Sequence, residues 1–385
     1  MPRLRVVVAG YFVRCPMGGY AWQVLHYLRG FRDAGHDVFF YEGTEYDENA
    51  YDPLLNETTR AYERNVPAVE RFLRAHGFRD DWAFRDVATG RAWGGGAERL
   101  DRVLARADVL VNLGGVSSFD AELRRGKRTL YLDLDPVWTQ LAVDRNPKYL
   151  SFLRDHDEFF TLGEALAGPG SPVPSGGITW KATRPPVATD LWRDAPPPAA
   201  NAAFTTIGKF HDEHRDLVLG GRTLSWSKRP EWLKLADLPR RTPGARFLLA
   251  TGPDDDARRV MEAGGWEFVA PLYVSSELER YRTFIRDSAG ELTVAKDMNI
   301  HVASGWFSDR AVCYLAAGRP VIDQDTGFGR FVPTGEGLFA FRTADEAVAA
   351  IEACLADPAR HRRRAAELAA EHFEAARVCA ALIAG

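Results

Sequence analysis

Short runs of apolar residues alternate along the chain with stretches in which apolar residues recur at helical spacing. Residues 4–9 form a β-branched run that ends in Gly10, which is typical of a buried parallel strand. Residues 20–34 carry apolar side chains along one face of a helix, and residues 38–41 are apolar again. This order predicts a strand, a helix and a second strand, the unit with which a Rossmann-type domain begins.

The same alternation continues beyond this unit. Further strands are predicted at residues 109–113, 129–134, 159–162, 204–208, 247–251, 267–269, 292–295 and 321–322. Further helices are predicted at residues 97–107, 308–317 and 344–355, with a long alanine-rich helix at 360–382. The polar and aromatic residues 45–93 predict helices and an insertion.

Prolines between residues 184 and 198 separate two series of strands and helices. We therefore predict an α/β protein with two Rossmann-type, doubly wound domains that face each other across a cleft. The N-terminal domain covers residues 1–185, a proline-rich linker covers 186–200, and the C-terminal domain covers 201–385. A length of 385 residues suits two such cores.

Charge and cysteine usage narrow the class of protein. The formal net charge of −4 argues against a protein that coats nucleic acid. Cys15, Cys313, Cys354 and Cys379 lie far apart, which disfavours a disulfide framework or a zinc site and fits a reducing cytosol. Because no apolar run is long enough to span a bilayer, we expect a cytoplasmic protein without a membrane span.

The most informative stretch covers residues 304–337. Ser304 and Gly305 lead into a predicted helix, whose unpaired N–H groups and positive end suit a pyrophosphate. Ser308 would either add a hydroxyl to that site or cap the helix. Asp325 lies at the carboxyl end of a predicted strand, where open α/β sheets bind ligands, and its carboxylate can accept hydrogen bonds from sugar hydroxyls.

This stretch resembles the donor-binding segment of GT-B glycosyltransferases, in the register of the glycogen-synthase-like branch. That branch has Glu-Gly-Phe-Gly, then a helix with Glu-Ala-x-Ala-x-Gly-x-Pro-Val, then a polar turn with glycine. Residues 305–308, 313–321 and 325–327 fall at the same spacings, with Gly305 and Cys313 at the positions of the two motif glutamates. The resemblance implies a GT-B-like fold and leaves retaining or inverting stereochemistry open. It implies these donor-binding residues: Ser304, Gly305, Trp306, Phe307, Ser308, Asp325, Thr326 and Gly327.

Two lysines could neutralise the charge of a departing nucleoside diphosphate. Lys296 ends a predicted strand beside the donor segment, and Lys228 follows Trp226-Ser227. The alternative is that both are solvated surface lysines. On the acceptor side, the loop after the first strand offers Tyr11, Arg14, Gly18 and Gly19, or it is an ordinary turn between strand and helix.

A carboxylate near the acceptor hydroxyl can act as the base of an inverting transferase. Asp133 and Asp135 lie at the end of a predicted strand that points into the cleft, although Asp135 precedes Pro136 and could only shape a turn. His156 is the next candidate. Neither Asp133-Leu134-Asp135 nor the run His211-Asp212-Glu213-His214 predicts a metal site, because the first lies away from the donor segment and the second has contiguous spacing.

These observations predict a metal-independent glycosyltransferase. It would move a sugar from a nucleotide-diphosphate sugar, which is a co-substrate and not a bound cofactor, to a small-molecule acceptor. No nucleic-acid partner is predicted. Two alternatives keep the same fold: a nucleotide-sugar epimerase or phosphorylase, and a catalytically inactive nucleotide-sugar-binding protein.

Overall fold

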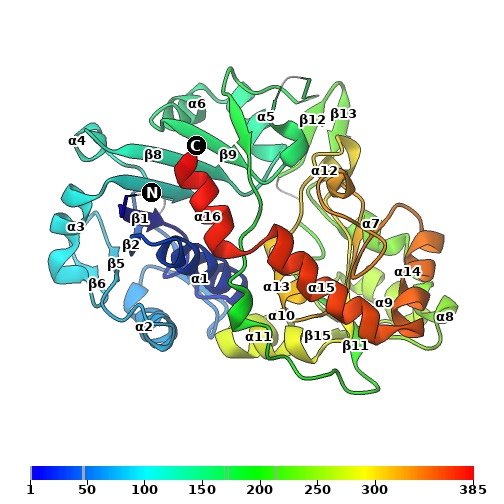
Figure 1. Cartoon of the computed structure of the whole chain (residues 1–385). Helices are drawn as coiled ribbons and strands as arrows, with labels where there is room; N and C mark the ends of the chain where they lie inside the picture. The colour runs from blue at the N-terminus through cyan, green and yellow to red at the C-terminus, as the bar shows by residue number, and fades with distance from the viewer. Residues whose placement is uncertain (1, 46–47, 169, 172, 213–214) are drawn as a thin grey trace.

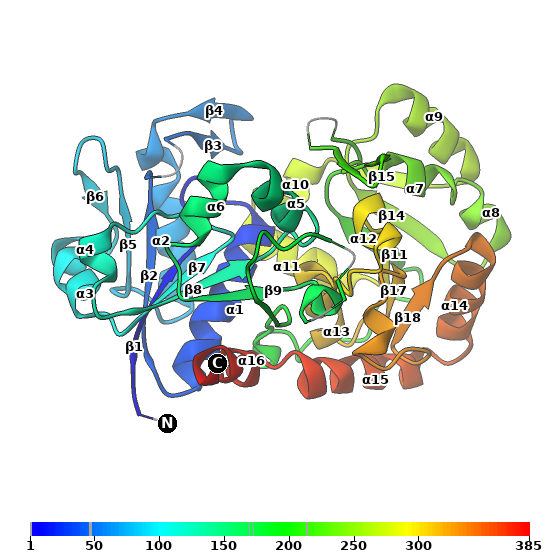
Figure 2. The ribbon, with the colours of Figure 1, turned by 90° about the horizontal axis from the view of Figure 1, so that it is seen from above.

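The computed structural model describes residues 2–45, 48–168, 170–171, 173–212 and 215–385. Two sheets lie side by side and form the two halves of the molecule (Figures 1 and 2). The N-terminal sheet has eight strands in the order β10-β9-β8-β7-β1-β2-β5-β6, and the C-terminal sheet has six in the order β15-β14-β11-β16-β17-β18. The predicted α/β architecture of two doubly wound sheets is therefore confirmed.

The strands of the N-terminal sheet are β1 (Arg5–Ala9), β2 (Asp37–Gly43), β5 (Trp82–Arg85), β6 (Ala92–Trp93), β7 (Val109–Leu113), β8 (Arg128–Asp133), β9 (Glu158–Thr161) and β10 (Trp180–Ala182). Those of the C-terminal sheet are β11 (Ala203–Ile207), β14 (Arg246–Ala250), β15 (Glu267–Val269), β16 (Gly290–Thr293), β17 (Val321–Gln324) and β18 (Leu338–Phe341). All neighbours pair in parallel except β5 and β6. Two short hairpins, β3 (Ala50–Asp52) with β4 (Glu57–Thr59) and β12 (Leu217–Leu219) with β13 (Arg222–Leu224), lie outside the sheets.

The helices in the N-terminal half are α1 (Gly18–Asp33), α2 (Val66–Ala75), α3 (Leu100–Arg106), α4 (Ala121–Arg124), α5 (Trp138–Arg145) and α6 (Pro147–Leu153). Those that follow are α7 (Arg229–Leu233), α8 (Leu238–Arg241), α9 (Asp255–Gly264), α10 (Pro271–Ser275), α11 (Leu278–Asp287), α12 (Asp297–His301), α13 (Asp309–Ala316), α14 (Ala344–Ala356), α15 (Pro358–His372) and α16 (Ala375–Ala384). In each sheet the strand order reverses beside the first strand, β1 or β11. This is the switch point at which open α/β sheets bind ligands.

Two sequence predictions need correction. Residues 45–93 are not mainly helical, because β5 and β6 extend the N-terminal sheet beyond β2. The predicted helix at 360–382 is two helices, α15 and α16, which are separated at Phe373 and Glu374. Phe373 is fully buried, and Glu374 is extended and accepts a hydrogen bond from the Thr189 hydroxyl.

The break between α15 and α16 carries the chain from one half to the other. In Figure 1, α15 runs along the C-terminal half and α16 lies beside α1. A methyl group on Gly30 of α1 would collide with Cys379 of α16, so the glycine permits this close packing. Arg128 of β8 also donates hydrogen bonds to the carbonyl groups of Leu382 and Ile383. The last helix is therefore attached to the N-terminal sheet.

The two halves share one hydrophobic core. Trp22 and Leu25 of α1 belong to the same buried cluster as Ile285 of α11 and Val312 of α13. The indole N–H of Trp22 donates to the carbonyl oxygen of Leu278 at 2.9 Å. The contact between α1 and the C-terminal half therefore fixes how the carboxyl ends of the two sheets face each other.

Gly18 and Gly19 give a matched test of this contact. A methyl group on Gly18 would overlap the side chain of Tyr281 on α11, whereas one on Gly19 would meet nothing within 4 Å. Gly18→Ala should lower the free energy of unfolding by about 1–3 kcal/mol, as overpacking does. Gly19→Ala should leave it unchanged or raise it by up to about 1 kcal/mol. Chemical denaturation measures both, and equal effects of the two substitutions would contradict the close approach of α1 and α11.

Candidate active site

Charged and aromatic side chains from both halves meet where the carboxyl ends of the two sheets face each other. Asp135 follows β8, Lys296 precedes α12, Lys228 precedes α7, and Trp306 lies two residues before the cap of α13. We call these four residues the junction site. They come from four separate segments, and only the tertiary fold brings them together.

An ion pair joins the two halves at the junction site. The Lys296 ammonium lies 3.0 Å from Oδ1 of Asp135 and 3.1 Å from the centre of the Trp226 ring. Burial lowers the pKa of Lys296, and the Asp135 carboxylate partly opposes that shift. Asp135 keeps 42% of its side chain exposed, so it remains open to a ligand.

Lys228 is half-buried and has charged neighbours of both signs. Burial lowers its pKa to about 7, the neighbouring Arg310 lowers it as well, and the carboxylate of Asp323 opposes the shift. Its ammonium lies 6.0 Å from the centre of the Trp306 ring. Because the loss of water disfavours its charged form, the Lys228 ammonium would gain from binding an anion.

A network of buried charges lies beneath Lys228. Arg310 of α13 forms an ion pair with Glu291 of β16, and it donates to the Ile207 carbonyl at 2.6 Å and to the Thr293 hydroxyl at 3.0 Å. One oxygen of Glu291 and one of Asp323 are buried without a hydrogen-bond partner among the described residues. Burial, followed by repulsion from Glu291, raises the pKa of Asp323 to about 7.

Sequence reasoning missed this network. The available signal was a charged residue inside each of two short apolar runs, Glu291 in β16 and Asp323 in β17. A charge in a buried strand needs a partner. Arg310, the second residue of α13, is that partner for Glu291.

Side chains of the protein itself form hydrogen bonds with the first residues of α13. The Ser308 hydroxyl accepts from the backbone N–H of Arg310 at 3.2 Å, so Ser308 caps the helix. The Asp309 carboxylate accepts from the side-chain amide of Gln23 on α1 at 2.9 Å. Burial raises the pKa of Asp309. Gln23 and Asp309 therefore tie the predicted diphosphate site to the N-terminal half.

The structure explains why Gly305 and Cys313 replace the two motif glutamates. Gly305 has a φ of 76°, and a side chain there would place its Cβ 2.9 Å from the backbone nitrogen of Ala165 in the N-terminal half. Cys313 is buried against α1, with its sulfur 3.5 Å from Nε2 of His26. Both positions are used for packing between the halves and have no room for a carboxylate.

The other donor-segment residues hold the segment together. The Ser304 hydroxyl donates to Oδ1 of Asn299 at 2.8 Å, and the Phe307 ring stacks on Phe373. The Thr326 hydroxyl donates to the Trp306 carbonyl at 2.5 Å. These contacts place Trp306 at the junction site. The side chains of Ser304, Phe307 and Thr326 themselves hold the segment in place.

Asp325 and Gly327 line a separate hollow of about 590 Å³, together with Arg330 and Arg342. One oxygen of Asp325 accepts from the N–H of Gly327 at 2.7 Å, and the other forms an ion pair with Arg342. Gly327 has a φ of 86°, which the turn after β17 requires. The structure therefore places these residues at the carboxyl end of β17, as the sequence predicts.

The loop after β1 is fixed by a buried ion pair. Arg14 and Glu42 are both wholly buried, with Nε of Arg14 3.0 Å from Oε1 of Glu42. Glu42 also accepts from the backbone N–H groups of Phe12 and Val13. Arg14 thus shapes the loop from within, and Glu42 at the end of β2 is a residue that the sequence analysis missed.

Tyr20 is a second residue of this region that the sequence analysis missed. Its side chain is 42% exposed, and its ring meets that of Tyr11 edge-on with centres 5.2 Å apart. The charges of Asp135 and Asp309 act on its phenol and raise its pKa, after the larger effect of burial. Tyr20 and Tyr11 therefore lie beside the junction site, on the side formed by the N-terminal half.

Asp133 and His156 lie beneath the sheet surface rather than at the junction site. Asp133 accepts from the hydroxyls of Thr139 and Thr161 and from the amide of Gln140, at 2.6–2.8 Å. Nε2 of His156 pairs with the Asn112 amide at 3.0 Å, and its pKa is lowered by burial. Both side chains are engaged in internal hydrogen bonds, so Asp135 is the exposed one of the three predicted bases.

The buried Asp133 should give the protein a measurable pH dependence. Burial raises its pKa to about 6 in the folded state, while the unfolded value is near 3.9. The folded state therefore binds this proton more tightly than the unfolded state does. Protonation of Asp133 stabilises the fold fully below about pH 4, and this stabilisation is lost as the pH rises through 6. Relative to Asp133→Asn, the wild-type free energy of unfolding should fall by about 2 kcal/mol between pH 4 and 7. Denaturant unfolding across this range measures the difference, and a rise with pH would contradict the assignment.

Three further features concern the described part of the chain. No group of three His, Cys, Asp or Glu side chains in it is placed to hold a metal ion; Glu213 and His214 of the run at 211–214 lie outside the described residues. No described helix combines the length and apolar character needed to cross a membrane. All four cysteines are buried and unpaired with one another.

Comparison with known proteins identifies the fold. No family model and no curated protein matches the sequence. Among solved structures, an α-glucosyltransferase in complex with UDP-glucose and DNA matches with a TM-score of 0.61 at 11% identity, over 100% of this chain and 99% of that one. Anabaena HepE in complex with UDP and glucose gives 0.55 at 13%, over 99% of both chains, and AviGT4, a glycosyltransferase of avilamycin A biosynthesis, gives 0.54 at 13%, over 99% and 96%. The chain therefore has the fold of GT-B glycosyltransferases over its whole length.

Proposed function

We propose that the protein is a glycosyltransferase that takes its sugar from a nucleotide-diphosphate sugar. The observation that carries this proposal is the junction site: two half-buried lysines of the C-terminal half both have a lowered pKa, and one of them, Lys296, pairs with the exposed carboxylate of Asp135 in the N-terminal half. The fold supports it, because solved structures with this fold include complexes with UDP or UDP-glucose.

The two lysines suit the leaving group. In the proposed reaction the acceptor oxygen bonds to the anomeric carbon while the bond from that carbon to the diphosphate breaks, and the nucleoside diphosphate leaves with the electron pair. Lys228 and Lys296 neutralise the charge that develops on its oxygens. Trp306 and Trp226, which pack against the two ammonium groups, hold these cations in place.

Asp135 suits the base. The Lys296 ammonium lies 3.0 Å from Oδ1 of Asp135. When Lys296 turns to the diphosphate, the Asp135 carboxylate is released to accept the proton of the acceptor hydroxyl. Tyr20 and Tyr11 form the neighbouring surface on which an acceptor would lie.

We propose a small molecule as the acceptor. The net charge of −4 and the acidic side chains Asp135 and Asp309 at this site are unfavourable to a polyanion. Some solved structures with this fold are complexes with DNA, but we assign DNA binding to those proteins alone. We also propose the cytosol as the compartment, since four buried free cysteines are compatible with reducing conditions.

Product analysis tests the proposal. The protein is incubated with UDP-, TDP-, GDP- and ADP-linked sugars in turn, with and without a panel of small hydroxylated acceptors, and the products are separated and identified. We expect release of one nucleoside diphosphate together with a glycosylated acceptor, whose anomeric configuration also gives the stereochemistry. An epimerised sugar without acceptor, a sugar 1-phosphate formed only with inorganic phosphate, or binding without turnover would favour the alternatives named above.

Metal independence is a separate prediction of this proposal. If the lysines neutralise the diphosphate, transfer should persist in the presence of excess EDTA, within twofold of the untreated rate. Initial rates with EDTA, and with EDTA followed by Mg²⁺ or Mn²⁺, measure this. Complete loss on chelation that either cation restores would show that a metal ion carries the charge compensation.

A further inference from the structure

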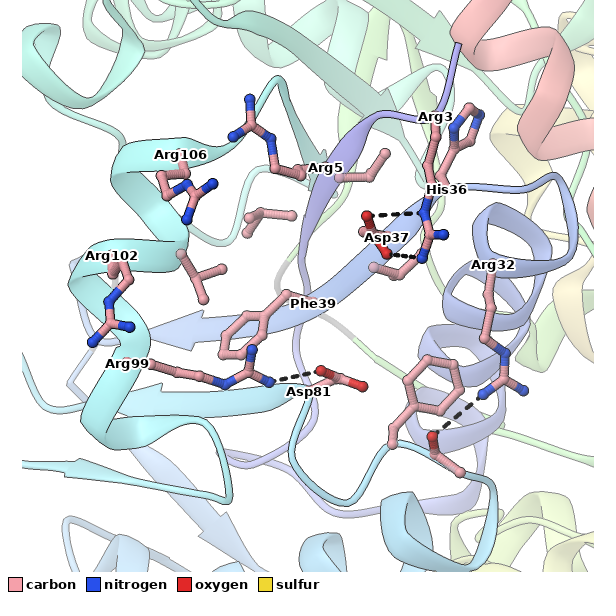
Figure 3. A pocket seen from close by; sticks show the side chains of 16 residues that line it. Arg3, Arg5, Arg32, His36, Asp37, Phe39, Asp81, Arg99, Arg102 and Arg106 are labelled. Atoms are coloured by element: carbon pink, nitrogen blue, oxygen red, sulfur yellow. Dashed lines mark hydrogen bonds and ion pairs between the residues drawn. The ribbon is translucent and has the colours of Figure 1, made fainter. Parts of the chain in front are cut away.

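A hollow of about 520 Å³ lies between α3 and the C-terminal end of α1, on the side of the N-terminal sheet away from the junction site (Figure 3). It lies at the amino ends of β1 and β2, whereas the junction site lies at the carboxyl ends of the strands. Its rim is formed by six arginines: Arg3, Arg5, Arg32, Arg99, Arg102 and Arg106. We call this hollow the arginine groove.

The positive charge of the arginine groove is only partly compensated. Four of the six arginines have an acidic partner: Arg3 pairs with Asp37, Arg5 with Asp108, Arg32 with Asp33 and Arg99 with Asp81. Arg102 and Arg106, one turn apart on α3, form no hydrogen bond or ion pair with any described residue. A concentration of cations on a protein of net charge −4 indicates an anionic ligand.

The floor of the arginine groove is apolar and aromatic. Phe39 and Phe78 are buried beneath the hollow. The Arg99 guanidinium lies 5.5 Å from the centre of the Phe39 ring, and that of Arg32 lies 4.4 Å from the centre of Phe78. Figure 3 shows Arg99, Arg102 and Arg106 on one side of the groove and Arg32 on the other. Arg99 and Arg32 also donate to the carbonyl groups of Asp80 and Gly77, so they frame the groove and leave Arg102 and Arg106 to bind a ligand.

We propose that the arginine groove binds a small organic anion, with its apolar body on the phenylalanine floor and its phosphate or carboxylate group held by Arg102 and Arg106. The volume is that of a small-molecule site, and guanidinium groups match oxyanions in geometry as well as in charge. The site is distinct from the junction site and does not depend on the function proposed for it.

Isothermal titration calorimetry tests this proposal in buffer free of phosphate and sulfate. The probe is 1-naphthyl phosphate, which combines an aromatic body with a dianion, and 1-naphthol and inorganic phosphate are its two fragments. The wild type should bind the probe at one site and each fragment at least tenfold more weakly. The variant R102E/R106E should bind the probe at least tenfold more weakly than the wild type, since a charge-assisted hydrogen bond contributes about 1.5–3 kcal/mol and about 1.4 kcal/mol is tenfold.

The control variant is R71E/R363E. Arg71 of α2 and Arg363 of α15 are also exposed, form no hydrogen bond or ion pair with a described residue, and lie outside the groove, so this variant makes the same charge change elsewhere. It should bind the probe like the wild type. R102Q/R106Q serves if the glutamate variant does not fold. The proposal is overturned if the wild type shows no saturable binding, if the groove and control variants bind equally well, or if inorganic phosphate binds as tightly as the probe.

Discussion

Replacement of Asp135 by asparagine should lower kcat for sugar transfer by about 10²–10⁴-fold, the usual contribution of a general base. Asparagine has the same shape but cannot accept the proton of the acceptor hydroxyl. In the proposed mechanism Asp135 contacts the acceptor and not the donor, and its protein partner, Lys296, would be free to bind the diphosphate in the variant. The Kd for the nucleoside diphosphate should therefore stay within a few-fold of the wild-type value.

A control variant must show that the loss of one negative charge in this region of the chain does not by itself lower kcat. Asp144 of α5 is exposed, and Asp144→Asn removes one negative charge without touching the junction site. Initial rates at saturating donor and acceptor, together with calorimetry of nucleotide binding, separate chemistry from affinity. Wild-type turnover by the Asp135→Asn variant would show that the base lies elsewhere or that the mechanism needs none.

Replacement of Lys228 or Lys296 by methionine should weaken binding of the nucleoside diphosphate by about 10–100-fold, because each removes a hydrogen bond to a charged group. Turnover should fall further, by about 10²–10³-fold, because the missing charge matters most when the diphosphate departs. Lys148→Met, at an exposed lysine of α6, is the control and should change neither quantity.

The pH dependence of binding gives Lys228 a signature that a structural role would not produce. Its pKa in the free protein is about 7, so the charged form that attracts the diphosphate is lost above that pH. Wild-type affinity should therefore fall as the pH rises from 7 to 9, and Lys228→Met should bind weakly with little change over that range. A wild-type affinity that is constant from pH 7 to 9 would contradict the assignment of Lys228 to the diphosphate.

The sequence is sufficient to predict the architecture because parallel strands that are buried on both faces appear in it as continuous apolar runs. The apolar runs that became β1, β7 and β8 are buried on both faces, so they stand out against the polar helices between them. β5 was missed because only Trp82, Ala83 and Phe84 are apolar there, a run too short to separate from a helix by periodicity. The break at Phe373 was missed because the reason for it, docking of α16 on α1, is tertiary.

Residues of the site could be predicted from the sequence only where their neighbours in the chain determine where they lie. The turn at Asp325 and the cap at Ser308 follow from neighbouring residues, and both lie where the pattern places them. Two other features depend on how the two halves meet: the pairing of Lys296 with Asp135, and the close approach of Ala165 to Gly305. The residues of each pair lie about 140–160 positions apart in the chain. No periodicity or short motif contains that information.

The central claim is that the C-terminal half binds a nucleoside diphosphate at the junction site, and calorimetric titration tests it most directly. UDP, TDP, GDP and ADP are titrated into the wild type, Lys148→Met and the double variant K228M/K296M. We predict that at least one of them binds the wild type and Lys148→Met at a single site with equal Kd, and that the double variant binds it at least a hundredfold more weakly. The account would be contradicted if no nucleoside diphosphate binds the wild type, or if the double variant binds as tightly as the wild type.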